Sequence, residues 1–364
     1  MKFSDFIDVR DGTHESPKAT DKGKKLITTK NLSTNQIDFS NAKNISVNDF
    51  NHINERSNVE KYDILLSMIG TVGNVYQEKN DNPEYAIKNL ALLKFHGDEL
   101  LSNWMNYYLQ SEDGQNKIKQ KLNGSTQQFI SLKELRNLEI ELPTKKEMET
   151  KSRPLNLIDG LIQKNNQLND NLLDIAKNIY HRILFSSQIT KTNLRSFATV
   201  VMGQSPSSKT YNENKIGIPL LNGAADFRNG IQPSKWTTDP KIIVNKGAYI
   251  FGVRATIGLT AKVSKPYAIG RGTGSAIPKD VNNEEILYFI LNDMFKKFEQ
   301  TESGSVYINI SKNDFENYRF NIPDRNGLLF FHEKVKPIMD QIYINKKQNK
   351  ILQTIKATLL SKIF

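Results

Sequence analysis

The sequence contains no cysteine among its 364 residues. Disulfide bonds, zinc ribbons and cysteine nucleophiles are therefore excluded. It also lacks any run of 18 apolar residues, so we expect no membrane-spanning helix. Its first residues lead directly into charged sequence with no apolar secretory segment. These absences predict a cytoplasmic protein that makes no use of a membrane.

The motifs of the enzymes that act on DNA are also missing. No Asn-Pro-Pro-Tyr or Asp-Pro-Pro-Tyr stands in the chain, which excludes that type of amino-methyltransferase site. The only Pro-Asp pair, at 323–324, is not followed by the (Asp/Glu)-x-Lys motif of a nuclease. GRGTG at 270–274 lacks the strand–turn–helix context of a nucleotide loop, and the five histidines have no metal-ligand spacing. We therefore predict no catalytic residue, no bound cofactor and no metal site.

Charge is the first positive feature. The net charge is +11, with 38% hydrophobic residues and a mean hydropathy of −0.53. The excess is confined to one half, because residues 1–185 hold 25 basic and 25 acidic side chains, whereas residues 186–364 hold 25 and 14. The length suits two or three domains with buried cores. The basic second half favours a polyanionic partner, although many soluble proteins are basic.

Two helical segments share one heptad pattern. In Ile158–Phe185 the a positions are Ile158, Asn165, Leu172 and Ile179, and the d positions are Leu161, Leu168, Ile175 and Arg182. Adding 180 gives the a positions of a second copy, which are Ile338, Asn345, Leu352 and Leu359. The d positions of that copy are mostly polar, so we expect its pairing to use a and e positions such as Ile342. The pattern predicts two paired, antiparallel coiled-coil helices, in preference to two unrelated amphipathic helices.

The segments before the helices repeat as well. FIDVRDG at 6–12 matches FATVVMG at 197–203, and KYDILLSMIGTVG at 61–73 matches KGAYIFGVRATIG at 246–258. YAIK at 85–88 matches YAIG at 267–270, and GSTQQFISLKELRNLEIELP at 124–143 matches GSVYINISKNDFENYRFNIP at 304–323. Tandem duplication of an α+β domain followed by a helix is the simplest explanation. We expect two similar domains at 1–145 and 186–325, and spacer helices at 146–185 and 326–364.

Within the first domain, the pattern predicts a buried strand over 62–69, a turn at 70–73 and a strand over 74–78. We expect a strand pair over 85–95, helices over 100–110 and 115–122, a short helix from Ser131 and a strand ended by Pro143. The two helices, if paired antiparallel, would separate the domains along a rod; 28 residues of helix span about 42 Å. One turn of DNA is about 34 Å long. The asparagines at a either specify register or lie exposed on a frayed seam.

Binding chemistry is concentrated in the loops. Cations can hold phosphates, while amides, hydroxyls and arginines can read base edges. The alternative for each lysine is a solvated surface charge. Candidate DNA-binding residues of the first domain are Thr13, His14, Lys18, Lys24, Lys88, Asn89, Gln127 and Gln128. Those of the second are Gln204, Ser205, Ser207, Lys209, Tyr211, Arg228, Arg254, Arg271 and Thr273.

On these segments the chain resembles the specificity (S) subunits of type I restriction–modification systems, the HsdS family. The similarity lies in VRDGTHESPK, MGQSPSSKTYNE, YAIKNLAL and the segment GSTQQFISLKELRNLEIELP before a long helix. It covers essentially the whole chain, and the repeated order of the motifs is more specific than any one of them.

The resemblance implies two target-recognition domains, each of which binds one half of a bipartite double-stranded DNA target. It implies antiparallel helices that set the spacer and dock two modification (methyltransferase) subunits carrying S-adenosylmethionine. Two restriction subunits, with ATP and Mg²⁺, would complete the complex. The subunit itself would be non-catalytic. A protein-only coiled-coil adaptor and a DNA-modifying enzyme with an unrecognised site remain the alternatives.

The chain departs from the family at the entry to each helix. The family often has acidic residues there, whereas this chain has KKEMETKSRP and DRNGLLFFHEKVKP. Each entry contains an extra proline, Pro154 or Pro337. Because proline removes a helical hydrogen bond, we expect each helix to be broken or to begin late at that residue.

Overall fold

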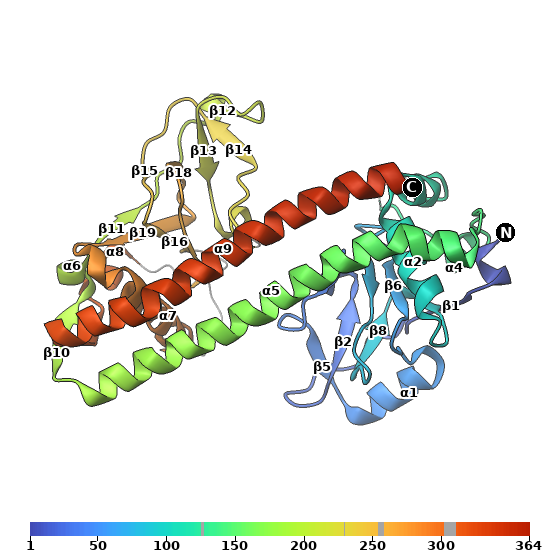
Figure 1. Cartoon of the computed structure of the whole chain (residues 1–364), viewed down its shortest axis with the longest axis horizontal. Helices are drawn as coiled ribbons and strands as arrows, with labels where there is room; N and C mark the ends of the chain where they lie inside the picture. Colours follow the sequence, from blue (N-terminus) through green and yellow to red (C-terminus); the bar gives the residue numbers. More distant parts are fainter. Residues whose placement is uncertain (125–126, 229, 254–257, 302–310) are drawn as a thin grey trace. The chain divides into compact units, whose positions relative to one another are not determined.

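A computed structural model describes the chain except residues 125–126, 229, 254–257 and 302–310. The chain divides into two compact units (Figure 1). Unit 1 comprises Met1–Asn165 and Lys347–Phe364, and unit 2 comprises Asn166–Lys346. Each unit therefore contains one mixed α/β body and one portion of each of the two long helices.

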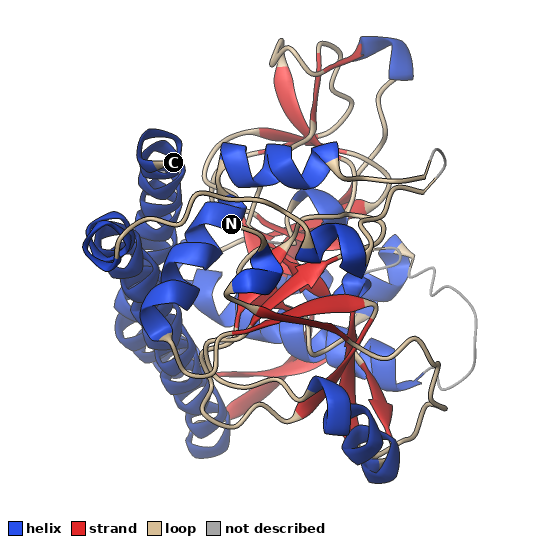
Figure 2. Cartoon of the chain, turned by 90° about the vertical axis from the view of Figure 1, so that its right-hand side faces the viewer, coloured by secondary structure: helices blue, strands red, loops and turns tan. Residues whose placement is uncertain are grey.

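Unit 1 is built on two small sheets that pack on each other, and helices cover their outer faces (Figure 2). The four-stranded antiparallel sheet has the order β1 (Asp8–Asp11), β9 (Leu90–Lys94), β6 (Ile64–Ser67), β7 (Val75–Gln77). The second sheet has the order β5 (Lys43–Ile45), β2 (Lys24–Thr28), β8 (Tyr85–Lys88), and β2 and β8 are parallel. The other strands and the α-helices of this body are β3 (Leu32–Ser33), β4 (Gln36–Ile37), α1 (Val47–Ser57), α2 (Glu99–Gln110), α3 (Glu112–Gln120) and α4 (Leu132–Arg136).

Unit 2 repeats this plan with additions. Its four-stranded sheet has the order β11 (Ala198–Met202), β19 (Thr273–Pro278), β16 (Tyr249–Gly252), β17 (Thr260–Lys262). Its second sheet has the order β12 (Tyr211–Asn212), β14 (Lys235–Thr237), β13 (Ile218–Leu221), β18 (Tyr267–Ile269), β15 (Ile243–Val244). The rest comprises β10 (Ile189–Asn193) paired with β20 (Arg319–Pro323), and the helices α6 (Leu194–Phe197), α7 (Glu284–Thr301) and α8 (Lys312–Asn317).

The internal repeat is confirmed by topology. Strands β1, β9, β6 and β7 occupy the same order as β11, β19, β16 and β17. The parallel pair β2–β8 has its counterpart in β13–β18. The short helices α4 and α8 begin at the same step of the repeat, each capped by a serine, Ser131 or Ser311, whose hydroxyl accepts a backbone N–H three residues on.

The central strands explain why the sequence is apolar at consecutive positions. In β6, Ile64 and Leu66 pack into the core beneath α2, while Leu65 packs into the core shared with β2 and β8. Successive strand side chains point to opposite faces, so a strand between two packed layers needs apolar residues throughout. All four β6 residues are buried. Full burial of each such apolar side chain contributes about 1.5–3 kcal/mol.

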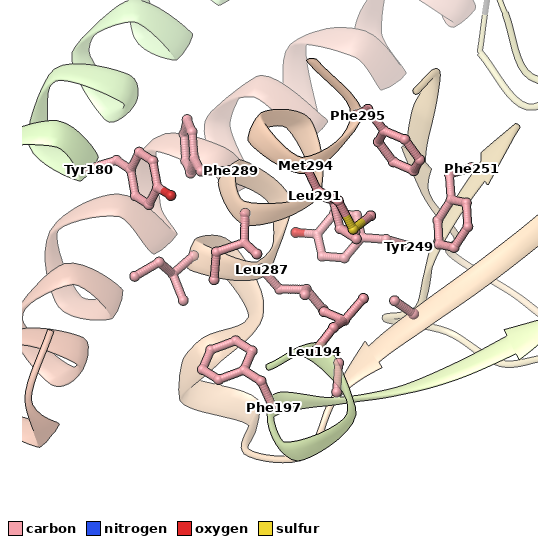
Figure 3. Close-up of a cluster of buried hydrophobic side chains, with 14 of the residues drawn as sticks. Tyr180, Leu194, Phe197, Tyr249, Phe251, Leu287, Phe289, Leu291, Met294 and Phe295 are labelled. Atoms are coloured by element: carbon pink, nitrogen blue, oxygen red, sulfur yellow. The ribbon is translucent and has the colours of Figure 1, made fainter. Parts of the chain in front are cut away.

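Strand β16 is used in the same way in unit 2. Tyr249 and Phe251 face the aromatic-rich core under α7, whereas Ile250 faces the second sheet. Figure 3 shows this core, where Phe289 of α7 stacks on Tyr180 with ring centroids 5.1 Å apart. Tyr180 belongs to the long helix α5 (Lys145–Ser186), so the helix is anchored directly in the body of unit 2.

Most of the predicted elements of the first domain are confirmed, and two predictions are wrong. The strands over 85–95 do not pair with each other: β8 and β9 belong to different sheets, joined at Asn89, whose φ of 54° turns the chain sharply between them. The prediction of a strand before Pro143 is also wrong. In unit 1 that segment forms only an isolated bridge between Lys2 and Glu139. Its counterpart β20 is a strand because β10 supplies a partner.

The expected breaks at the prolines are also wrong. Helix α5 contains Pro154, and α9 (Arg325–Ile363) contains Pro337, each without interruption. Each proline lies a few turns inside its helix. There the missing N–H removes one hydrogen bond, and tertiary packing of the surrounding turns keeps the helix continuous.

Within each unit the long helices run antiparallel. In unit 1, Asp159 contacts Lys356 and Asn165 contacts Asn349. Residue numbers therefore increase along α5 in the direction in which they decrease along α9. In unit 2, Asn169 contacts Asn345, and Tyr180 packs on Phe331 with ring centroids 6.1 Å apart. The predicted antiparallel pairing is therefore confirmed.

The buried seam differs from the predicted one on α5. Ile158 at a is buried, but Leu161, Leu168 and Ile175 at the predicted d positions are 51%, 44% and 49% exposed. The helix instead turns its e positions inward, including the buried Ala176. The a and e positions thus form the contact on both helices. This arrangement was predicted for α9, whereas an a and d seam was predicted for α5. Of the other a positions, Asn345 is buried, and Leu172, Ile179, Ile338, Leu352 and Leu359 are half-buried.

Each asparagine at an a position of the seam pairs with an asparagine at an e position of the other helix. The Nδ2 of Asn165 donates to Oδ1 of Asn349 at 2.8 Å, and Nδ2 of Asn345 donates to Oδ1 of Asn169 at 2.8 Å. Adding 180 to Asn165 and Asn169 gives Asn345 and Asn349, so both bonds are the same interaction in the two copies. The exposed-seam alternative is excluded for Asn345, which is 2% exposed.

Replacing Asn169 with alanine should lower the free energy of unfolding by about 1–3 kcal/mol, because the amide of Asn345 would stay buried without its acceptor. Asn171 of the same helix is exposed. Asn171→Ala is therefore a matched control and should change the stability by no more than about 0.5 kcal/mol. Chemical denaturation measures both. Equal stabilities for the two variants would contradict a structural role for the asparagine pair.

Candidate nucleic-acid interface

In unit 1 the candidate residues lie at one end of the four-stranded sheet. Asp11 at the end of β1 pairs with Ala91, near the start of β9, and Ser67 at the end of β6 pairs with Leu90. The segments that follow β1 and β6 and the one that precedes β9 therefore emerge at the same edge. They carry Thr13 and His14, the glycine turn at 70–73, and Lys88 with Asn89.

Backbone hydrogen bonds fix the first of these segments against β8. The N–H of Thr13 donates to the carbonyl of Ile87 at 3.0 Å, and the N–H of Asn89 donates to the carbonyl of Thr13 at 3.2 Å. Gly12 allows this crossing, because a Cβ at that position would lie 2.3 Å from the carbonyl oxygen of Ile87. The glycine in VRDG is thus required by close backbone approach.

The side chains at this crossing form one polar cluster. The carboxylate of Asp11 is buried and lies 2.9 Å from Nε2 of His14, and Nδ1 of His14 lies 3.0 Å from Oδ1 of Asn89. Arg56, at the end of α1, donates to the other oxygen of Asp11. No local pattern pointed to Arg56, which is 45 residues from Asp11 and belongs to no repeated motif. Lys88 donates to the hydroxyl of Ser16, which tethers the same loop.

Gln127 and Gln128 belong to a second, neighbouring projection. The backbones of Asn123 and Phe129 exchange two hydrogen bonds, and the carbonyl of Gln128 accepts the N–H of Gly70 at 3.4 Å. Both glutamines are exposed. Phe129 beside them is 39% exposed, an aromatic surface residue that sequence reasoning did not single out.

The structure does not bring Lys24 into this group. Lys24 begins β2, pairs with Glu84 at 2.8 Å and lies 5.8 Å from the ring of Phe50. Because β2 and β8 are parallel, Lys24 lies at the opposite end of the second sheet from Lys88. Lys18 is exposed on the loop after β1.

Unit 2 repeats the crossing with other side chains. The N–H of Gly203 donates to the carbonyl of Thr273 at 2.9 Å, and that of Gln204 to the carbonyl of Ile269 at 3.1 Å. A Cβ on Gly203 would lie 2.2 Å from the carbonyl oxygen of Gly270. The hydroxyl of Ser205 accepts the backbone N–H of Arg271 at 3.2 Å, which holds the two loops together.

Asn222 is a residue of this second site that sequence reasoning missed. Its Oδ1 accepts the hydroxyl of Ser205 at 3.2 Å, and its backbone carbonyl accepts the N–H of Gly272 at 3.1 Å. It follows β13, whose counterpart in unit 1 is β2. Only the parallel pairing of β13 with β18, from distant parts of the chain, brings it beside Arg271.

The other candidates of the second domain are distributed unevenly. Gln204, Ser207, Lys209, Arg228 and Arg271 have exposed side chains, and Tyr211 is half-buried at the start of β12, with the ammonium of Lys235 5.8 Å from its ring centroid. Thr273 is fully buried, and its hydroxyl donates to the carbonyl of Leu221 at 3.1 Å, so it is structural. Arg254 lies outside the described residues.

These two surfaces combine cations with amides and hydroxyls whose backbone is held by hydrogen bonds. Across the described part of the chain, no group of three or more histidine, aspartate or glutamate side chains is arranged to hold a metal ion. Within the same residues, no helix is long and apolar enough to cross a membrane.

Comparison with known proteins identifies the repeated bodies. The family model of the type I restriction modification DNA specificity domain matches residues 1–174 and again residues 186–359. The chain belongs to the family of type I restriction–modification specificity subunits. The two matches fall on the two copies of the internal repeat.

Individual members of the specificity-subunit family are distant relatives. A Methanocaldococcus jannaschii protein assigned as the MjaX type I restriction enzyme specificity subunit is 24% identical, covering 86% of this chain and 76% of the relative. The HindI specificity subunit of Haemophilus influenzae is 30% identical over 47% of this chain and 39% of its own length. The crystal structure of an S subunit from M. genitalium shares the fold, with a TM-score of 0.55 at 17% identity, covering all of this chain and 95% of that chain.

Replacing Gly12 with alanine should destabilise unit 1 by about 1–3 kcal/mol, because the added methyl group would overlap the carbonyl of Ile87. A Cβ on Gly160 of α5 would meet nothing within 4 Å beyond the backbone of its own helix, so Gly160→Ala should instead stabilise the chain by about 0.5–1 kcal/mol. Thermal or chemical denaturation measures whether each substitution lowers or raises the free energy of unfolding. A neutral Gly12→Ala variant would contradict the tight crossing.

Proposed function

We propose that this specificity subunit reads a bipartite duplex, with one half-site bound by each unit. The supporting observation is that two copies of one scaffold carry chemically different side chains on equivalent, rigidly held loops. Unit 1 offers Thr13, His14, Lys88 and Asn89 at its crossing, and unit 2 offers Gln204, Ser205 and Arg271. A repeated backbone scaffold whose loops carry different side chains suits recognition of two different DNA sequences.

The proposed roles follow from side-chain chemistry. The exposed amides of Gln127, Gln128 and Gln204 and the guanidinium of Arg271 are suited to base edges, because each can make paired hydrogen bonds. The lysines at positions 18, 88 and 209 suit phosphates, which position the protein without reading sequence. Ser207, Tyr211, Arg228 and Arg254 remain proposed contacts of unit 2. The net excess of 11 positive charges in residues 186–364 favours a polyanion there.

The long helices are proposed to set the spacer between half-sites and to dock the modification subunits. Their flanks carry the d and g positions, which expose apolar side chains to solvent. In unit 1 these are Leu157 and Leu161 of α5 with Ile351 and Ile355 of α9. In unit 2 they are Leu168 and Ile175 of α5 with Ile344 of α9. One exposed apolar patch in each unit would suit two modification subunits.

Catalysis is proposed to belong to the partners. The modification subunits would carry S-adenosylmethionine, and two restriction subunits would use ATP and Mg²⁺. This chain would contribute only the choice of sequence. Its own residues bind the duplex, orient it and present it, without transferring a group.

Replacing Arg271 with alanine should weaken binding of the half-site read by unit 2 by about 1–3 kcal/mol if the guanidinium contacts a guanine. The binding site itself should persist, because the contact of Ser205 is to the backbone N–H of Arg271. The measurement is competition binding to a duplex whose target is first established by methylome sequencing of a host carrying the complete system. Discrimination at the other half-site should be unchanged.

Lys279 provides the matched control. It follows β19 at its far end, whereas Arg271 precedes the same strand, and its side chain is also exposed. Lys279→Ala should leave half-site discrimination at the level of the unsubstituted chain. Binding that is equally sequence-independent in all three proteins would contradict the proposal.

Replacing Leu161 with aspartate should weaken association with the modification subunit by about ten-fold or more, because it puts a charge in the proposed apolar patch. Leu161 is half-exposed, so the chain should still fold. Gln163→Asp introduces the same charge two residues away at another exposed position and serves as control. Analytical ultracentrifugation of the mixed subunits measures both. Equal association of the two variants would rule out this face.

A further inference from the structure

The two ends of the helix pair are not chemically equivalent. In unit 1, Nζ of Lys356 lies 2.8 Å from each carboxylate oxygen of Asp159. At the repeat offset of 180, the residue of α9 equivalent to Asp159 is Met339, and the residue of α5 equivalent to Lys356 is Ala176. Both of these residues belong to the apolar core of unit 2. One copy of the contact is therefore an ion pair and the other is apolar.

The ion pair is well enclosed. The side chain of Lys356 is 7% exposed and that of Asp159 is 20% exposed. The hydroxyl of Tyr107 donates to Oδ2 of Asp159 at 2.9 Å, and the ammonium of Lys356 lies 5.1 Å from the Tyr107 ring centroid. Burial lowers the pKa of Lys356, and Asp159 opposes that shift. Either charge would be costly if it were buried without the other.

The asparagine pairs do not have this asymmetry. Asn165 and Asn169 of α5 occupy the same steps as Asn345 and Asn349 of α9. If α5 of one chain paired with α5 of a second chain in the same register, Asn165 would still meet Asn169. The corresponding pairing of two α9 helices would join Asn345 to Asn349. The asparagines can therefore specify register, but they cannot distinguish the chain's own helix from that of a second copy.

The charged pair distinguishes pairing of unlike helices from pairing of like helices. In an α5–α5 pairing, Asp159 would face Ala176 of the second chain. In an α9–α9 pairing, Lys356 would face Met339 of the second chain. A helix-exchanged dimer would thus contain two buried carboxylates and two buried ammonium groups without their partners. We propose that the Asp159–Lys356 pair selects pairing of α5 with α9 over pairing of α5 with α5, and of α9 with α9, of a second copy.

The test is mixed refolding of full-length chains. Two batches of the same variant, each with a different affinity tag, are unfolded together and refolded at several concentrations. Dimers that contain both tags are then quantified by sequential affinity capture and native mass spectrometry. The unsubstituted chain should give only background. Asp159→Met with Lys356→Ala, which makes both ends apolar, should increase mixed dimers by about ten-fold or more.

Three further variants separate partner choice from a merely structural role. Each single substitution should lower the melting temperature, and the apolar double variant should recover most of that loss. Asp159→Lys with Lys356→Asp retains opposite charges across the contact, so it should refold without mixed dimers. Asp159→Asn with Lys356→Gln removes the charges at similar size and replaces the apolar variant if that one does not fold.

Two results would overturn the proposal. One is a folded, charge-free double variant that yields no more mixed dimer than the unsubstituted chain. The other is a charge-exchanged variant that yields as much mixed dimer as the charge-free one. Neither result depends on DNA, so the proposal can fail while the proposed half-site recognition stands.

Discussion

The fold of each unit depends on burying one strand on both faces. Strands β6 and β16 lie in the middle of their sheets, with a helix-covered core on one face and a second sheet on the other. A one-residue shift of register would move Leu65 or Ile250 into the wrong core, so the register is strongly determined. Once it is fixed, the ends of the neighbouring strands are fixed too, and the loops must emerge at one edge.

This constraint explains how the loops can change chemistry without changing place. The crossing over β8 or β18 is made by backbone hydrogen bonds and by glycine, at Gly12 and Gly203, where no side chain fits. The backbone hydrogen bonds of the crossing do not involve the side chains that differ between the two copies. Thr13 and His14 can therefore be replaced by Gln204 and Ser205, and Lys88 by Gly270, on an unchanged frame. Recognition loops need both rigid backbones and variable tips.

The sequence predicted the repeat, the fold class, the paired helices and most strands of the first domain, because these depend on periodic apolar residues. Prediction from the sequence failed where the structure of a segment depends on pairing with residues far away in the chain. The segment before Pro143 has strand-like residues but no partner strand, whereas its copy β20 has β10. Arg56 contacts Asp11 and Asn222 contacts Ser205 only because folding brings distant segments together. Thr273 is buried with a hydrogen bond to the carbonyl of Leu221, which no local sequence pattern predicts.

The error in the helix seam has a more general cause. Leucine and isoleucine occur on α5 at a, d and e positions, so two apolar stripes share one helix and the heptad pattern alone cannot say which is buried. Only the second copy resolves this, since α9 has Gln341 and Gln348 at d and its own apolar contact at e. Antiparallel partners related by a repeat must use equivalent positions. The polar d residues of α9 therefore imply that the leucines at d on α5 face outward, as their exposure of 51% and 44% at Leu161 and Leu168 shows.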